Sequence, residues 1–316
     1  MNIKQVFELG VKMGITADPR GEVKVKKYLE RTKKEYEEMK DKDKEYFDED
    51  SLVNPYADSK IHFADQNKEV KRVLAGIDIG SAEILLASQL SERGKEIDVV
   101  IAHHPIGQSL ADLHGVMDMA VEIYEANGVP VHTAEKLMEE RIKEVGRGVH
   151  PANHYRVVDM ARLLNVNFIN THTITDNLVN NFLTDFLAEK KPELIKDLVD
   201  ALLEIPEYKQ AKKQSAGPKL FSGGPNHRVG KILLEMTGGT SPSEKVYQAF
   251  SQAGISTIVG MHLNEVSNKK ASANNMNVVI AGHIASDSLG MNLFLDELEK
   301  QGIEVITCGG LMRIKR

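Results

Sequence analysis

Three predicted strands of this chain each lead into a histidine, and two of these histidines are followed four residues later by an aspartate. The strands DVVIA, NFINT and NVVIAG carry this pattern, and the residues that follow them are His103, His104, His172, Asp176, His283 and Asp287. Imidazole and carboxylate groups are the expected ligands of first-row divalent metals. A single aspartate at the start of a helix is usually a cap, but the recurrence at three strand ends favours a metal site.

The ends of parallel strands are a place where such side chains can meet. In open α/β sheets, ligands bind in the crevice beyond the carboxyl ends of the strands, so residues far apart in sequence can converge there. His283 and Asp287 are four residues apart and share one face if a helix begins at about His283. Pro105 predicts a turn after His103 and His104, which would let two adjacent imidazoles bind two neighbouring ions.

The elements that must position these residues follow an alternating pattern. From Val70 onwards, short apolar runs alternate with helical segments, which is typical of βαβ units and a largely parallel sheet. The predicted strands are Arg72 to Ile77, Ile97 to Ala102, Val129 to His132, Val166 to Asn170, Ser256 to Val259, Val278 to Ala281 and Glu304 to Thr307. A charged helical segment at about 192–213 ends in the Gly- and Pro-rich stretch QSAGPKLFSGGPNHRVG, where we place a lobe boundary. We expect an α/β protein with an N-terminal helical extension (1–66), a first lobe (67–215), a second lobe (216–316) and the metal site between the lobes.

The N-terminal extension is highly charged. Tyr28, Thr32 and Tyr36 are spaced by four residues, which places them on one helical face. This segment is interpreted either as a surface helix with Glu–Lys pairs or as an oligomer contact. The stretch DEDSLVNPYADSK that follows predicts a loop.

Composition limits the class of protein. The chain has 316 residues, of which 41% are apolar and 27% are charged, and this is ordinary globular usage. Its single cysteine, Cys308, cannot form an internal disulfide, and the N-terminus lacks a signal-peptide pattern, so we expect a cytoplasmic protein. No stretch approaches the roughly 20 apolar residues that span a bilayer. The net charge of −6 and the absence of tryptophan argue against broad nucleic-acid binding.

Two further patterns are open to more than one interpretation. His150 and His154 are also four residues apart, but no carboxylate follows at metal-ligand spacing, so we expect a loop or a substrate contact near the site rather than a metal ligand. The stretch from Gly238 to Glu244 predicts a turn into a helix, with Ser241 and Glu244 as a capping box. No nucleotide-binding fingerprint and no GxSxG nucleophile motif is present.

The motifs together resemble the Nif-three-like family, whose members are also called GTP cyclohydrolase I type 2 homologues. The matching stretches, within about residues 70–310, are GIDIGSAEILLASQL, DVVIAHHP, HTITD, STIVGMHLNEVSNKKASANN and AGHIASDSLGMNLFLDEL. The resemblance implies a dinuclear metal centre in a two-lobed α/β fold with largely parallel sheets, assembled into a toroidal hexamer. The HHP, HTxxD and GHxxSE motifs of the family imply that the metal ligands are His103, His104, Asp176, His283 and Asp287.

The sequence departs from the family pattern in three places. Asp287 stands where the family usually has glutamate, which is one methylene longer. The segment between His104 and His172 is longer than in typical members. Residues 1–66 resemble nothing in the family.

The implied ligands predict a hydrolytic chemistry. Two divalent cations with two carboxylates leave positive charge at the site, which suits a small anionic substrate. Paired ions about 3.5 to 4 Å apart can activate water to attack amide-like, ring C–N or phosphoester bonds. We expect Asp176 to bridge the ions, and His172 to act as general acid or to support Asp176. The ligands suit zinc, manganese, iron or cobalt. The resemblance implies a purine or pterin nucleotide as substrate, and the alternative is a non-catalytic metal-binding or regulatory hexameric scaffold.

Overall fold

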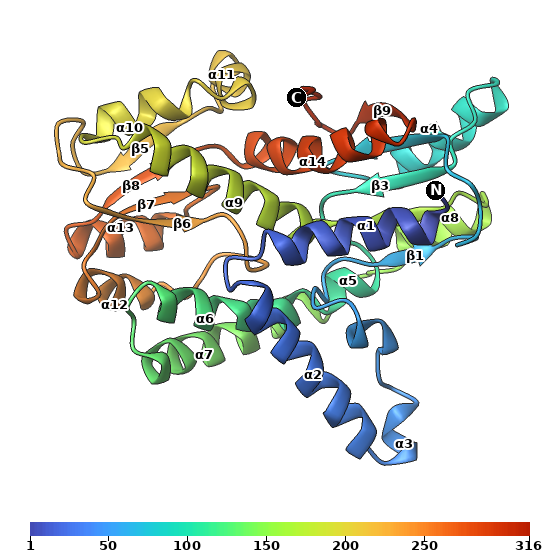
Figure 1. Cartoon of the computed structure of the whole chain (residues 1–316), viewed down its shortest axis with the longest axis horizontal. Helices are drawn as coiled ribbons and strands as arrows, with labels where there is room; N and C mark the ends of the chain where they lie inside the picture. Colours follow the sequence, from blue (N-terminus) through green and yellow to red (C-terminus); the bar gives the residue numbers. More distant parts are fainter.

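The computed structural model describes residues 1–316 and contains two β-sheets separated by long helices (Figure 1). The first sheet has the order β1-β4-β3-β2-β9, and all its pairs are parallel except the β1–β4 pair at one edge. Its strands are β1 (Ile61–Phe63), β2 (Arg72–Gly76), β3 (Val99–Ala102), β4 (Phe168–Asn170) and β9 (Glu304–Cys308).

The second sheet has four strands in the order β5-β8-β7-β6. The β8–β7 and β7–β6 pairs are parallel, and β5 is an antiparallel edge strand. Its strands are β5 (Lys219–Ser222), β6 (Lys231–Glu235), β7 (Ile255–Gly260) and β8 (Asn277–Ile280). The mixed α/β fold with mostly parallel sheets confirms the fold class expected from the alternating pattern.

Three helices run through the middle of the molecule, between the sheets (Figure 1). They are α1 (Ile3–Thr16), α9 (His172–Lys190) and α14 (His283–Lys300), and α9 packs against both of the others. The first nine residues of α9 and most of α14 are buried, as residues between two layers must be.

The remaining helices cover the outer faces. They are α2 (Glu22–Glu38), α3 (Asp41–Lys44), α4 (Ser81–Glu92), α5 (Gln108–Ala111), α6 (Met119–Ala126), α7 (Val131–Val149), α8 (Arg156–Leu163), α10 (Ile195–Leu202), α11 (Pro206–Lys213), α12 (Val246–Gln252) and α13 (Glu265–Ala273), with 3₁₀ turns η1 (Glu49–Leu52) and η2 (Leu113–Asp118). None of the helices is both long and apolar enough to cross a membrane.

One predicted strand is wrong. Residues Val129 to His132 form no strand, because Pro130 precedes the first turn of α7, which begins at Val131. The apolar run is short, and the residues after it continue an amphipathic helix whose buried side includes Ala134 and Met138. The strands β1, β5 and β6 were not predicted, and each has polar or partly exposed positions that hide the apolar pattern.

The expected division at 66 and 215 stays a proposal, and two elements cross it. Strand β9, near the C-terminus, pairs with β2 in the first sheet rather than joining the second. Helix α1 lies in the core against α9, with Ile3 and Val6 fully buried, so the N-terminal extension is not peripheral throughout. Only α2, α3 and η1 project from the body (Figure 1).

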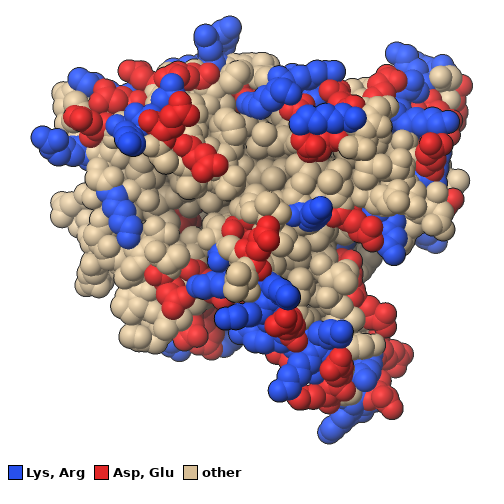
Figure 2. Space-filling view, in the orientation of Figure 1, with Lys and Arg blue, Asp and Glu red and all other residues tan.

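The projecting segment carries both signs of charge. Figure 2 shows Lys and Arg intermixed with Asp and Glu over it, with no concentrated basic patch on the face in view. Val25 is the only buried residue of α2, and Tyr36 packs against Phe47 at a ring-centroid distance of 4.7 Å. This matches a solvated surface helix with its own small aromatic contact.

Candidate metal centre

The three strand ends with histidines converge between the two sheets. His103 and His104 follow β3, α9 begins at His172 directly after β4, and α14 begins at His283 after β8. Strands β3 and β4 are neighbours in the first sheet, whereas β8 belongs to the second. The site is therefore formed where the carboxyl ends of two different sheets face each other, and not at one sheet edge.

A glycine lets the two helices that carry the aspartates approach each other. A Cβ atom added at Gly290 of α14 would lie 2.3 Å from the carbonyl oxygen of Thr175 in α9, which is far inside van der Waals contact. Only glycine fits at this crossing. The close approach brings Asp176 and Asp287, each one turn after the first residue of its helix, to the same imidazole, that of His103.

The Nε2 atoms of four histidines lie around the two carboxylates, that of His172 at 3.9 Å from Oδ2 of Asp176. Nε2 of His103 is 3.5 Å from Oδ1 of Asp176 and 3.4 Å from Oδ1 of Asp287. Oδ2 of Asp287 is 3.5 Å from Nε2 of His104 and 3.6 Å from Nε2 of His283. Two ligands of one tetrahedral metal at about 2.1 Å are about 3.4 Å apart, whereas an N–H···O hydrogen bond is about 2.9 Å long. The spacing is that of metal ligands.

Two overlapping groups could each hold an ion. One consists of His103, His172 and Asp176, and the other of His103, His104 and Asp287. In each group the ligand atoms lie within 4.8 Å of one another. His283 adjoins the second group through Asp287. The structure thus brings together all five residues expected as ligands, and it adds His172 to them.

The buried carboxylate oxygens provide a test of whether these residues fit a metal. Oδ1 of Asp176 and both oxygens of Asp287 are buried without a hydrogen-bond donor. Leaving such an oxygen unpaired costs about 1–3 kcal/mol, and more if it is charged. Divalent cations would satisfy these atoms, and the set of imidazoles and carboxylates is the chemistry that first-row metals prefer. The residues therefore fit the metal that the fold family implies.

The Nδ1 atoms of three of these histidines contact residues outside the two ligand groups. Nδ1 of His104 is 2.7 Å from Oδ1 of Asp78, and Nδ1 of His172 is 2.7 Å from Oδ2 of Asp58. Nδ1 of His103 is 2.9 Å from the hydroxyl of Thr175, which itself donates to a backbone carbonyl and so accepts from the ring. Each Nδ1 is therefore a protonated nitrogen, so in the neutral ring each Nε2 would present a lone pair to a bound cation.

The charges of the metal-free group are strongly coupled. Burial raises the pKa of Asp176 to about 8 and lowers that of His103 to about 4. Burial also opposes the charge of His172, but the carboxylates of Asp176 and Asp58 outweigh it and raise the pKa of His172 to about 9. For Asp287 burial is likewise outweighed, by the imidazole of His103 and its neighbours, and the pKa is lowered. The metal-free site thus retains protons that a bound cation would displace.

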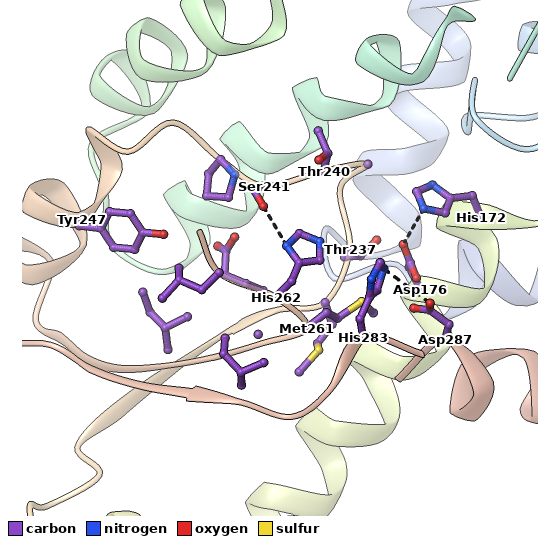
Figure 3. A pocket seen from close by; sticks show the side chains of 18 residues that line it. His172, Asp176, Thr237, Thr240, Ser241, Tyr247, Met261, His262, His283 and Asp287 are labelled. Atoms are coloured by element: carbon purple, nitrogen blue, oxygen red, sulfur yellow. Dashed lines mark hydrogen bonds and ion pairs between the residues drawn. The ribbon is translucent and has the colours of Figure 1, made fainter. Parts of the chain in front are cut away.

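A pocket opens beside the two aspartates (Figure 3). It is lined by Asp176, Asp287 and His172 at one end and extends past His262 to Tyr247. The loop from Gly239 to Pro242 forms one wall. That loop does not cap a helix as predicted, since α12 begins only at Val246.

Other predicted residues lie elsewhere. His150 and His154 occupy the turn after α7, and neither lines the pocket. Nε2 of His154 is 2.8 Å from the carbonyl oxygen of Val149, which gives this ring a structural partner. They belong to neither ligand group.

Three residues of the site were missed. Asp58 and Asp78 carry no motif spacing, although Asp58 lies in the predicted loop and Asp78 in GIDIG. His262 lies in the pocket, with Nδ1 3.0 Å from the Ser241 hydroxyl and its ring centroid 4.9 Å from that of His283. The signal for His262 was its place in the stretch STIVGMHLNEV, at the end of a predicted strand.

Comparison with protein-family models and with curated proteins found no match for the sequence. Solved structures do match it. A NIF3 superfamily protein from Sphaerobacter thermophilus is 29% identical, with a TM-score of 0.71, and the match covers 81% of this chain and 92% of that one. Reduced HcgD from Methanocaldococcus jannaschii is 15% identical over 83% of this chain and 93% of that one, with a TM-score of 0.50, and shows a likeness of fold alone.

The fold and the site define a two-sheet α/β protein with a buried histidine–aspartate group suited to metal binding. Within that class, the similarity to the Sphaerobacter thermophilus protein and the ordered HHP, HTITD and GHIASD motifs show that the chain is a divergent NIF3-like family member. The family resemblance of the motifs is thereby confirmed.

Proposed function

We propose that this protein binds two divalent metal ions and is a metal-dependent hydrolase of the cyclohydrolase type. The observation that carries the proposal is the pair of buried carboxylates whose oxygens lack donors and face the Nε2 atoms of neighbouring imidazoles. A pocket beside them supports catalysis, because a purely structural or storage site is normally closed on all sides by protein ligands.

The two groups suggest a division of ligands. His103, His172 and Asp176 would hold one ion, and His104, His283 and Asp287 the other. Asp287 is the better candidate for a bridge, because its two oxygens face imidazoles of different groups, whereas Asp176 faces only the first. The expected bridge through Asp176 stays the alternative.

The residues have distinct tasks in this proposal. Bound cations would supply Lewis acidity, which lowers the pKa of water and polarises the bond under attack. Asp58 and Asp78 fix the ring orientation of His172 and His104 through their Nδ1 atoms. His172 is therefore proposed as a ligand, with the general-acid role as the alternative.

The substrate that the family resemblance suggests is an anionic nucleotide or a pterin-type compound. The ions are proposed to be zinc, manganese, iron or cobalt, since imidazole and carboxylate ligands suit all four. A second candidate function is a non-catalytic metal-binding or regulatory scaffold. We also propose a homo-hexamer, which light scattering can test against the monomer mass of 35.1 kDa.

The test of the proposed function combines metal analysis with a substrate screen. Protein purified without added metal is analysed for metal content, then assayed for hydrolysis of cyclic amides, nucleotides and phosphoesters. About two metals per chain together with turnover would support the hydrolase. Two metals without turnover favour the scaffold, and a protein that holds no metal even after loading contradicts both.

A further inference from the structure

The pocket beside the proposed metal centre has a second end, away from the candidate ligands. In Figure 3, Asp176 and Asp287 lie at one end of it, Tyr247 at the other, and His262 between them. Glu235, the last residue of β6, also lines the pocket. We call the end formed by Glu235, Tyr247 and His262 the distal subsite.

The lining of the pocket offers no lysine or arginine side chain to an anion. None of its 18 residues is lysine or arginine. Arg141 supports the wall from behind, and its side chain is occupied, because Nε donates to the carbonyl oxygen of Ser241 at 3.0 Å and Nη1 pairs with Glu144 at 2.9 Å. Proteins usually hold phosphate and carboxylate groups with arginine or lysine. An anionic group in this pocket would therefore find a cationic partner only at the metal ions.

The carboxyl group of Glu235 is the main hydrogen-bonding group of the distal subsite. Its neighbour Tyr124 is buried in the core. Burial raises the pKa of Glu235 to about 8, and no charged side chain opposes that effect. At neutral pH the group is therefore mostly a neutral acid, which offers one O–H donor together with an acceptor oxygen.

The apolar residues around this carboxyl group suit a flat ring. Met236, Met261, Ile258 and Ile280 line the same pocket. Apolar walls with a few placed polar groups are the usual construction of a small-molecule site, in which the polar groups set orientation and specificity. A ring between these walls would have its edge within reach of the distal subsite and its other side toward the aspartates.

We propose that the distal subsite recognises the edge of an uncharged cyclic amide, with the ring N–H and C=O paired to the carboxyl group of Glu235. The proposal rests on the proposed function, since it assigns the ring of that substrate to the distal subsite. Any phosphate groups would contact the metal ions or solvent. Recognition would then depend on the ring and not on the phosphates.

Two variants of Glu235 separate this role from a structural one. Glu235→Leu removes the donor and the acceptor while keeping a similar volume. Glu235→Gln keeps one donor and one acceptor, so it preserves the pattern that pairs with an amide edge. Both are checked for metal content and thermal stability, because Glu235 also contacts Tyr124.

The measurement is calorimetric titration of the metal-loaded protein with guanosine, with dihydrouracil as a smaller cyclic amide and inorganic phosphate as the matched control ligand. We expect Glu235→Leu to weaken guanosine binding by about tenfold or more, the equivalent of one or two hydrogen bonds. Phosphate affinity should change by less than about twofold, because phosphate would bind at the metals. Glu235→Gln should retain guanosine affinity within about threefold.

Several results would overturn the proposal. They are unchanged guanosine binding in Glu235→Leu, equal loss of guanosine and phosphate binding, and wild-type protein that binds neither guanosine nor dihydrouracil. If Glu235→Leu does not fold, Glu235→Gln decides, and a tenfold loss there counts against the amide pairing. Guanosine binding that depends on Glu235, without turnover of any substrate, would reject the hydrolase and support the distal subsite. Turnover that is unchanged in Glu235→Leu would support the hydrolase and reject the distal subsite.

Discussion

Oδ1 of Asp287 lies 3.4 Å from Nε2 of His103, although the two residues follow strands of different sheets. The other oxygen of the same carboxylate faces His104 at 3.5 Å. A single carboxylate thus contacts two adjacent imidazoles through different oxygens, which would let it bridge two ions in the proposed centre. Aspartate at this position, one methylene shorter than the glutamate usual in the family, still reaches both.

The first prediction compares the two aspartates. Asp287→Asn should lose both ions or retain less than about one metal per chain, because removing a bridging charge leaves two cations facing each other. Asp176→Asn should lose mainly the ion of the first group and keep the other. Metal-to-protein ratio, measured with circular dichroism as a control for folding, distinguishes the two. Greater loss in Asp176→Asn would return the bridging role to Asp176.

The second prediction concerns His172. His172 is proposed as a ligand whose ring is held by Asp58. The variant His172→Gln should therefore reduce the metal content by about one ion per chain. A general acid without a ligand role would leave both ions in place and lower only turnover. His262→Gln is the matched control, because His262 lies in the same pocket outside both ligand groups. Full occupancy in His172→Gln would make the general-acid role the better interpretation.

The third prediction tests the outer partner of His104. Asp78 accepts from Nδ1 of His104, and losing such a partner typically weakens metal binding by about 10- to 100-fold. Asp78→Asn should therefore raise the dissociation constant for zinc, measured by competition with a chelator, without affecting the fold, since Asp78 is largely exposed. Asp185→Asn, an exposed change on α9, is the control and should leave affinity unchanged. Equal zinc affinity in the two variants would show that Asp78 does not support the metal site.

Sequence patterns identified the residues at the centre but not those that support it. His103, His104, Asp176, His283 and Asp287 were predictable because strand ends and i,i+4 spacing are local features. Asp58 was not, since its bond to His172 spans 114 residues and depends on how the N-terminal segment folds back. The placement of β9 beside β2 is likewise a long-range pairing that periodicity cannot reveal.

The fourth prediction is a pH dependence of the metal-free protein. The folded-state pKa of His172, about 9, and of Asp176, about 8, both lie above the unfolded values of about 6.5 and 3.9. Between these values the native state binds more protons than the unfolded state, so stability falls as pH rises. We expect the melting temperature of the metal-free protein to fall from about pH 6.5 to pH 9, and metal affinity to rise over the same range. His103, with its lowered pKa, acts in the opposite direction only below about pH 6.5.

A pH scan of thermal unfolding with and without zinc checks this expectation. The metal-loaded protein should show a smaller decrease above pH 6.5, because the cation replaces the protons. A flat metal-free profile across that range would contradict the coupled titration of His172 and Asp176. A rising profile would contradict its sign.

The last prediction concerns the helix crossing that aligns the site. In Gly290→Ala the added methyl group would meet the carbonyl oxygen of Thr175 at 2.3 Å, and a backbone atom cannot move aside without shifting α9. Overpacking of this kind costs about 1–3 kcal/mol, and a shift of α9 would also displace Asp176 from His103. We expect lower stability in urea and weaker binding of the first ion. Gly148→Ala is the control, because nothing lies within 4 Å of its added Cβ and helical alanine is favoured by about 0.5–1 kcal/mol. Equal stability and metal content in both variants would show that the helix spacing does not set the geometry of the metal centre.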